Sequence, residues 1–169
     1  MKTYLPYGNE RLELELDATN VTVIEPRFLP GLADEAVAFE QAVRNPIGCR
    51  PLRETILASD QVAVVIPDIT RPLPTERLLP WLFAELGHVP ADHFVIVNGT
   101  GSHRANTPAE LAAMCGAKVA QRYQIVNHDA HDRQSLEQAG VGEDGQPVFY
   151  NRQYCQADKR IVLGFIEPN

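Results

Sequence analysis

The sequence predicts an α/β fold in which a mostly parallel sheet is flanked by helices. Two apolar runs support this prediction: QVAVVIP (61–67) and HFVIV (93–97) are nearly continuous rather than alternating. Such runs are typical of parallel strands that are covered on both faces. Segments with helical periodicity separate the predicted strands, and strands that alternate with helices indicate βαβ units.

The N-terminal segment predicts a different element, an antiparallel strand pair. In RLELELD (11–17), Leu12, Leu14 and Leu16 alternate with charged residues, which is the period of a half-buried strand. NVTVIEP (20–26) is expected to be the second strand of the pair, and it stops at a proline.

The remaining elements show either the periodicity of a helix or that of a strand. Ala36, Phe39 and Val43 fall on one face of a helix predicted over 33–44. Further helices are expected over 51–59, 78–86, 108–114 and 151–156, and further strands over 123–129, 147–150 and 160–166.

Length and charge restrict the class of protein. At 169 residues, the chain has the size of one domain with a substantial core. The net charge of −7 argues against a nucleic-acid binder, which would need a basic face. No apolar run approaches the roughly 20 residues of a membrane span, and the first residues lack the apolar core of a signal peptide. We therefore expect a cytoplasmic protein with no nucleic-acid or membrane partner.

Polar residues gather where the predicted parallel strands end. The segments 68–71 (DITR), 98–104 (NGTGSHR), 127–132 (NHDAHD) and 167–169 (EPN) each follow one apolar strand. The carboxyl ends of parallel strands meet at one edge of an open sheet, and ligands bind at that edge. The sequence therefore predicts that these segments share one edge and form a site there.

The segment NGTGSHR combines groups that suit an anion with a group that suits proton transfer. Gly99 and Gly101 allow positive φ and a close approach of the main chain to a ligand. His103 offers an imidazole, a group that can accept and return a proton in the physiological pH range. Arg104, and Arg71 from the neighbouring segment, have planar guanidinium groups that match a carboxylate or a phosphate. A polar turn between a strand and a helix is the alternative interpretation, because the pattern is neither a Walker A loop nor GxGxxG.

The segment NHDAHD permits a metal interpretation. His128, Asp129, His131 and Asp132, together with Asn127, are potential ligands, as a metal-dependent hydrolase would require. However, the HxxH spacing alone is common, and no third ligand can be identified from spacing. A polar segment at the edge of the sheet is the alternative interpretation.

Four motifs together resemble one family. PDITRPLP, NGTGSHR, NHDAHD and LGFIEP occur in this order and spacing in the N-terminal domain of the nickel-dependent lactate racemase family, and the resemblance runs from about residue 10 to the end. It implies that residues 1–169 are the N-terminal α/β domain of a two-domain enzyme, with the C-terminal domain outside this chain. It also implies racemisation or epimerisation of a small 2-hydroxy acid with a nickel-pincer nucleotide as cofactor.

The resemblance assigns roles to residues of the matched motifs. His103 would be the catalytic acid/base in a proton-coupled hydride transfer, and no metal ligand is expected in this chain. The cofactor would contact Asp68, Thr70, Arg71, Gly99, Thr100 and Gly101, and the substrate would contact Arg71 and Arg104.

The sequence departs from the family pattern at its end. Asn169 stands where the family typically has a second catalytic histidine, and an amide cannot act as a base. The lysine that attaches the cofactor and the histidine that ligates nickel follow later in the family and are not in this chain. We therefore expect the isolated chain to be inactive. A non-catalytic module that binds a nucleotide or a carboxylate is the alternative function.

Overall fold

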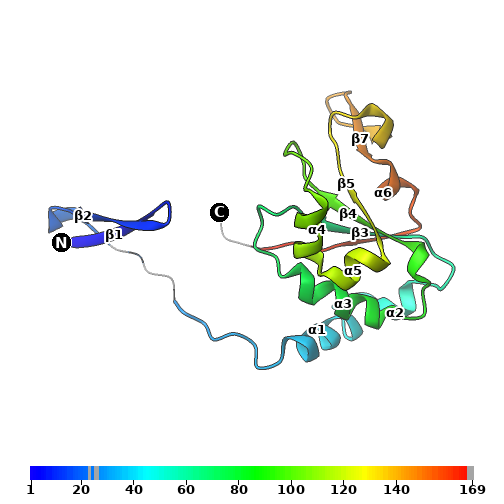
Figure 1. Ribbon diagram of the computed structural model, residues 1–169, viewed down its shortest axis with the longest axis horizontal. Coiled ribbons are helices and arrows are strands. Elements are labelled where there is room, and N and C mark those ends of the chain that lie inside the picture. The colour runs from blue at the N-terminus through cyan, green and yellow to red at the C-terminus, as the bar shows by residue number, and fades with distance from the viewer. Residues whose placement is uncertain (23, 25–26, 167–169) are drawn as a thin grey trace. The chain divides into compact units, whose positions relative to one another are not determined.

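The computed structural model describes residues 1–22, 24 and 27–166. The chain divides into two compact units, residues 1–33 and 34–169, which are described separately here (Figure 1). The N-terminal unit holds an antiparallel strand pair, and the main unit holds a parallel sheet with its helices. The predicted fold class is therefore confirmed.

The N-terminal unit is a β-hairpin of β1 (Lys2–Tyr7) and β2 (Glu10–Glu15). The two strands pair antiparallel, with Thr3 opposite Leu14. Gly8 lies in the two-residue turn between them and has a φ of +60°. Turns of this length require positive φ to match the twist of the flanking strands, and glycine adopts it without strain.

The predicted strand pair is confirmed, but the predicted partner strand is wrong. The segment 11–17 pairs with the residues before it, not with 20–26. Residues 18–20 form a short 3₁₀ helix, η1 (Ala18–Asn20), and residues 23, 25 and 26 lie outside the described part of the chain. The tight turn makes the nearer segment the easier partner, because a short loop costs little entropy to close.

The main unit is built on a four-stranded sheet in the order β5-β4-β3-β8, with every pair parallel. The register places Val64 of the central strand β3 beside Ile96 of β4 and Ile161 of β8. The two central strands are the two apolar runs of the sequence. The strand bounds are β3 (Val62–Pro67), β4 (Phe94–Gly99), β5 (Gln124–Asn127) and β8 (Lys159–Val162).

Helices cover one face of this sheet (Figure 1). Leu79 and Leu82 of α3 pack in the same buried cluster as Val64 and Ile96 of the sheet, and Cys115 of α4 joins it. No helix among the described residues is long and apolar enough to cross a membrane. The helix bounds are α1 (Glu35–Arg44), α2 (Leu52–Thr55), α3 (Thr75–Glu85), α4 (Pro108–Cys115) and α5 (Ala117–Arg122).

A hairpin and a short helix lie on the other face. The hairpin pairs β6 (Leu136–Val141) with β7 (Pro147–Asn151) and leads into α6 (Arg152–Gln156). Side chains of β7 and α6 line a common cleft with Val65 and Val97 of the sheet. The predicted strand at 147–150 is confirmed, but it pairs with β6, which was not predicted, and does not join the parallel sheet.

The structure also differs from the prediction in several individual elements. Helix α2 covers only the first part of 51–59, because Ile56 adopts an extended conformation with φ −115° and ψ 123° and buries its side chain in the core. Helix α5 was not predicted. It is separated from α4 by Gly116, whose φ is +84°. Strand β8 ends at Val162, four residues before the predicted end at 166.

Replacing a core residue tests the packing of the main unit. Ile96→Ala is expected to lower the free energy of unfolding by about 2–5 kcal/mol, because it leaves a cavity at a fully buried position. Leu57→Ala is the control, since this side chain is 60% exposed and surface changes cost within about 0.5 kcal/mol. Urea unfolding followed by circular dichroism measures both values, and equal losses would contradict the assigned core.

Candidate active site

Three of the predicted strand-end segments share one edge of the sheet. The register of β3 and β4 places Pro67 beside Gly99, so the segments that begin at Asp68 and Thr100 start side by side. The register of β4 and β5 places Asn98 beside Asn127. The prediction of a common edge is therefore confirmed for 68–71, 98–104 and 127–132. The fourth segment, 167–169, lies outside the described residues.

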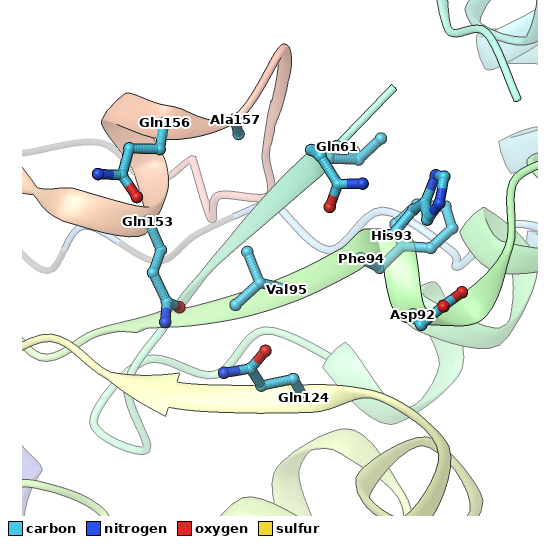
Figure 2. A pocket seen from close by; sticks show the side chains of 10 residues that line it. Gln61, Asp92, His93, Phe94, Val95, Gln124, Gln153, Gln156 and Ala157 are labelled. Carbon is cyan, nitrogen blue, oxygen red and sulfur yellow. The ribbon is translucent and has the colours of Figure 1, made fainter. Parts of the chain in front are cut away.

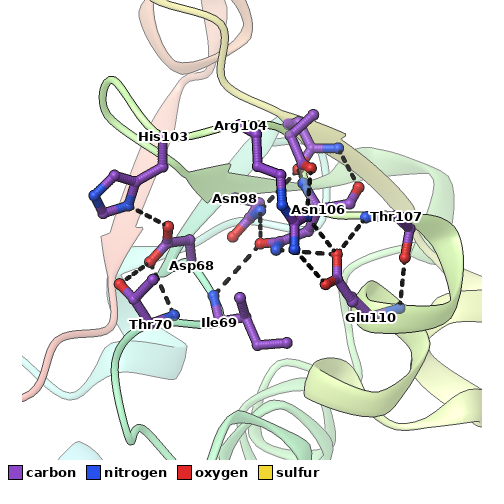
Figure 3. Close-up of polar contacts among 11 residues, drawn as sticks. Asp68, Ile69, Thr70, Asn98, His103, Arg104, Asn106, Thr107 and Glu110 are labelled. Carbon is purple, nitrogen blue, oxygen red and sulfur yellow. Dashed lines mark hydrogen bonds and ion pairs between the residues drawn. The ribbon is translucent and has the colours of Figure 1, made fainter.

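Asp68 and His103 form a hydrogen-bonded pair at this edge (Figure 3). Nδ1 of His103 lies 2.6 Å from Oδ2 of Asp68. The Asp68 side chain is 6% exposed, whereas that of His103 is 55% exposed. The other carboxylate oxygen, Oδ1, accepts hydrogen bonds from the hydroxyl (2.6 Å) and the main-chain N–H (3.2 Å) of Thr70. A nearly buried carboxylate therefore holds an imidazole that is open to solvent.

The environment of Asp68 determines the tautomer of His103. Burial raises the pKa of Asp68, but the hydrogen bonds from Thr70 and His103 outweigh it, and the pKa lies below its usual value. The carboxylate is therefore ionised at neutral pH and only accepts hydrogen bonds. Nδ1 of a neutral His103 must then donate, which leaves the lone pair on Nε2. An imidazole held in this way can accept a proton at Nε2.

The turn after β4 brings main-chain groups to the edge. Gly101 has a φ of +59°, and a Cβ on Gly99 would lie 3.2 Å from the carbonyl oxygen of Ile66. Both positions therefore favour glycine. Thr100 is buried and its hydroxyl donates to the carbonyl oxygen of His128. A ligand at this position would therefore contact the main chain of Thr100, because its hydroxyl is already hydrogen-bonded within the protein.

The two predicted arginines have different surroundings. Arg71 is exposed, and its main-chain N–H donates to the carbonyl oxygen of Asp68 at 3.1 Å. Arg104 forms a two-pronged ion pair with Glu110 of α4, at 2.7 and 2.8 Å, and also donates to the carbonyl oxygen of Ala105. The guanidinium of Arg104 is thus held against the N-terminus of α4, and binding a substrate carboxylate there would compete with Glu110.

Glu110 is bound on several sides. The hydrogen bonds from Arg104 are the main reason why the pKa of Glu110 lies well below its usual value, and the main-chain N–H of Thr107 adds to the effect. Thr107 and Glu110 also form a reciprocal capping box at the start of α4. The ion pair therefore links the strand-end loop to the helix that follows it.

The segment 127–132 forms turns rather than a metal-ligand set. The side chain of Asp129 accepts from the main-chain N–H groups of His131 and Asp132, and Asp132 caps the 3₁₀ helix η3 (Arg133–Ser135). Within the described ranges 1–22, 24 and 27–166, no group of three or more His, Cys, Asp or Glu residues is placed to hold a metal ion. The described residues therefore give the hydrolase interpretation no ligand set.

Sequence reasoning missed a polar cleft at the opposite end of the sheet (Figure 2). It measures about 280 Å³ and lies where the strands begin, beside the 3₁₀ helix η2 (Ala91–His93). Its polar lining is dispersed along the chain, so no local motif signals it. The cleft does not belong to the edge that carries Asp68. Its polar side chains are Gln61, Asp92, His93, Gln124, Gln153 and Gln156.

Neutralising Glu110 tests the ion pair. A carboxyl group whose pKa is lower in the folded than in the unfolded chain stabilises the fold above its unfolded pKa, and the effect is lost as pH falls. Glu110→Gln should therefore lower the urea midpoint at neutral pH, and the difference should shrink below about pH 4. Glu143→Gln, at an exposed turn, is the control. A difference that is independent of pH would contradict this account.

Changing Asp68 tests the tautomer. In the unmodified chain, neutral His103 should carry its proton on Nδ1, and Asp68→Asn should give a mixture, because an amide can donate as well as accept. Long-range ¹H–¹⁵N spectra of the imidazole measure the ratio directly. Asp129→Asn, on an exposed turn of the same edge, should leave it unchanged. The same ratio in Asp68→Asn as in the unmodified chain would refute the assignment.

Comparisons with known proteins identify the family of this chain. The chain matches the family model of the lactate racemase N-terminal domain over residues 7–169. It is 28% identical to the lactate racemase of Thermoanaerobacterium thermosaccharolyticum and 29% identical to that of Lactiplantibacillus plantarum. Each alignment covers 98% of this chain and 40% of the relative, so the chain spans about two fifths of the length of these curated relatives.

Solved structures also show a similarity to lactate racemase. The lactate racemase apoprotein from Thermoanaerobacterium thermosaccharolyticum superposes on the whole chain with a TM-score of 0.84 at 27% identity, and the match covers 40% of that structure. A protein from Thermotoga maritima matches 80% of this chain and 34% of its own, with a TM-score of 0.60 at 19% identity, which supports the fold alone. Because the family model covers nearly all of its residues, the chain belongs to the lactate racemase N-terminal domain family.

Proposed function

We propose that this chain is the N-terminal domain of an enzyme that racemises or epimerises a small 2-hydroxy acid, and that His103 is its acid/base. The observation that supports this proposal most directly is the Asp68–His103 pair, with Nδ1 held at 2.6 Å and the ring open to solvent. Membership of the lactate racemase family supplies the reaction class.

The proton step follows from the tautomer. Nε2 of His103 accepts the proton of the substrate hydroxyl, which makes the hydrogen on the same carbon easier to lose as a hydride. A bound cofactor would supply the acceptor for this hydride, and Nε2 of His103 would give the proton back to the oxygen when the resulting 2-keto acid is reduced on its other face. Asp68 holds the imidazole in one orientation and stabilises its protonated form. A positioned base of this kind contributes roughly 100- to 10,000-fold in rate.

The hydride acceptor must come from a cofactor, because no amino-acid side chain accepts a hydride. In the family, this acceptor is the nickel-pincer nucleotide. The edge of the sheet fits an anionic part of such a group: Thr70 and Arg71 are exposed there, in the loop after β3, and the end of β3 lies beside Gly99 at the end of β4. The described residues do not supply a metal-ligand cluster. In this proposal, ligands for the nickel come from groups beyond the described residues.

The substrate carboxylate requires a cation near His103. We assign this role to Arg71, which is exposed and lies three residues after Asp68, the hydrogen-bond partner of His103. An arginine fixes a carboxylate through two parallel hydrogen bonds and so presents the carbinol carbon in one orientation. In this proposal Arg104 shapes the loop, and its substrate contact is secondary.

The remaining catalytic groups belong to the rest of the protein in this proposal. The relatives are about two and a half times as long as this chain, which is consistent with a C-terminal domain that completes the site. The second base of the family pattern would fall at Asn169, outside the described residues. We therefore expect the isolated chain to bind anions at this edge but not to racemise a 2-hydroxy acid.

A chimera tests the catalytic role of His103. This chain would replace the matching 40% of the Lactiplantibacillus plantarum lactate racemase, loaded with the family's cofactor. His103→Gln should lower kcat for lactate racemisation by at least about 100-fold, because it removes the base. His131→Gln, an exposed histidine on the same edge, is the matched control.

Two results would contradict the proposal. Activity that survives His103→Gln would show that another group moves the proton. Racemisation by the isolated chain without cofactor would show that the hydride account is wrong. If the chimera binds nicotinic acid mononucleotide through Arg71 but has no activity that depends on His103, the chain is the non-catalytic binding module instead.

A further inference from the structure

Three asparagines meet beneath the loop that carries His103. Asn98 is the last residue but one of β4 and is fully buried, Asn106 ends the loop and is 4% exposed, and Asn127 ends β5. We call these residues the asparagine cluster. They come from two strand ends and one loop end, so they connect segments that are far apart in the chain.

The side chain of Asn98 is the centre of this cluster (Figure 3). Its Nδ2 donates to Oδ1 of Asn106 at 2.9 Å and to Oδ1 of Asn127 at 2.8 Å. Asn106 and Asn127 also bind each other directly. Oδ1 of Asn127 accepts from the main-chain N–H of Asn106, and Nδ2 of Asn127 donates to the main-chain carbonyl oxygen of Asn106. Both protons of the Asn98 amide are therefore used.

The main chain of Asn98 holds the other end of the same loop. Its carbonyl oxygen accepts from the N–H of Thr100 at 3.0 Å and from the N–H of His128 at 2.9 Å. Asn98 thus binds the start of the loop through its carbonyl and the end through Asn106. Oδ1 of Asn106 also accepts from the N–H of Ile69 at 3.4 Å, next to Asp68. One buried residue therefore joins the loop of His103 to the loop of Asp68.

We propose that Asn98 is a positioning residue, which sets the His103–Asp68 geometry through Asn106. The imidazole is more than half exposed, so packing alone does not determine where it lies. Its position depends on where the ends of the loop are held, and Asn98 holds both. This inference rests on the proposed function, since the geometry matters for catalysis only if His103 moves the proton.

The amide chemistry of Asn98 suits this role. The group is neutral and does not titrate, so the loop ends stay in place while His103 gains and loses a proton. An aspartate has the same shape but would direct a carboxylate oxygen at the amide oxygens of Asn106 and Asn127. Two hydrogen bonds would be lost, and the oxygen atoms would repel each other. Oδ1 of Asn98 is buried and has no partner among the described residues, a cost that the two donated bonds offset.

Imidazole spectra of the 169-residue chain test this inference without any assay of activity. The variants are Asn98→Ser, which removes both donors, and Asn98→Asp, which keeps the shape. Asn45→Ser is the matched control, because this exposed asparagine donates one hydrogen bond, to the carbonyl oxygen of Gln41 at the end of α1. Urea unfolding of each variant measures the loss of stability separately.

We expect Asn98→Ser to remain folded and to shift the tautomer ratio of His103 towards that of Asp68→Asn. Asn45→Ser should lose stability with no change in the ratio. A folded Asn98 variant with the unmodified ratio would show that Asn98 only stabilises the fold, and would overturn the inference. If neither Asn98 variant folds, Asn106→Ser is measured instead, because it removes the hydrogen bond between Asn98 and Asn106 from the loop side. An unchanged tautomer ratio in Asn106→Ser would overturn the inference.

The chimera separates this inference from the proposed function. There, Asn98→Ser should lower kcat by about 10- to 100-fold and leave KM nearly unchanged, as expected for a misplaced base. A shifted tautomer with unchanged kcat would confirm the positioning role and contradict the catalytic role of His103. An unchanged tautomer would contradict the positioning role, whatever the activity.

Discussion

The parallel register between β3 and β4 is the constraint on which the candidate site depends. It places Pro67 beside Gly99, so the two loops that follow begin at neighbouring points on one edge. Both strands lie in the buried centre of the sheet, where local opening is costliest. A shift of one residue would turn the side chain of Asp68 to the opposite face. The 2.6 Å contact between Asp68 and His103 is therefore a consequence of strand pairing as much as of loop sequence.

Asp68, Arg104 and Glu110 at this edge each have local polar partners, although the chain as a whole is acidic. Asp68 is nearly buried, and hydrogen bonds from Thr70 and His103 keep it ionised. Arg104 and Glu110 neutralise each other at the start of α4. These pairs hold the loop in one conformation and leave the Nε2 side of the imidazole directed away from Asp68. Preorganised groups of this kind favour proton transfer, because they need not rearrange during the reaction.

Family membership and geometry support different parts of the proposed function. The family indicates a reaction on a hydroxy acid, and the relatives' greater length is consistent with catalytic groups contributed by a second domain. The geometry supports what this chain would contribute in the proposal: a histidine with an oriented tautomer, an exposed Arg71 three residues after Asp68, and a loop whose ends are bound by neutral amides. In the proposed division, this chain would supply proton transfer and anion binding, and a bound cofactor would supply the hydride chemistry.

The sequence alone determined the elements whose signals are local. The apolar runs predicted the central parallel strands, and the polar residues after them predicted the edge that carries the candidate site. Both predictions were possible because the pattern of apolar and polar residues along a short segment indicates its burial and its periodicity. The tertiary structure decided which side chains meet. Asp68 binds His103, 35 residues away, and Asn98 meets Asn127, 29 residues away. Thr100 turns inward instead of facing a ligand. These partners could not be predicted, because each hydrogen bond depends on the path of a loop between strands, and no local pattern specifies that path.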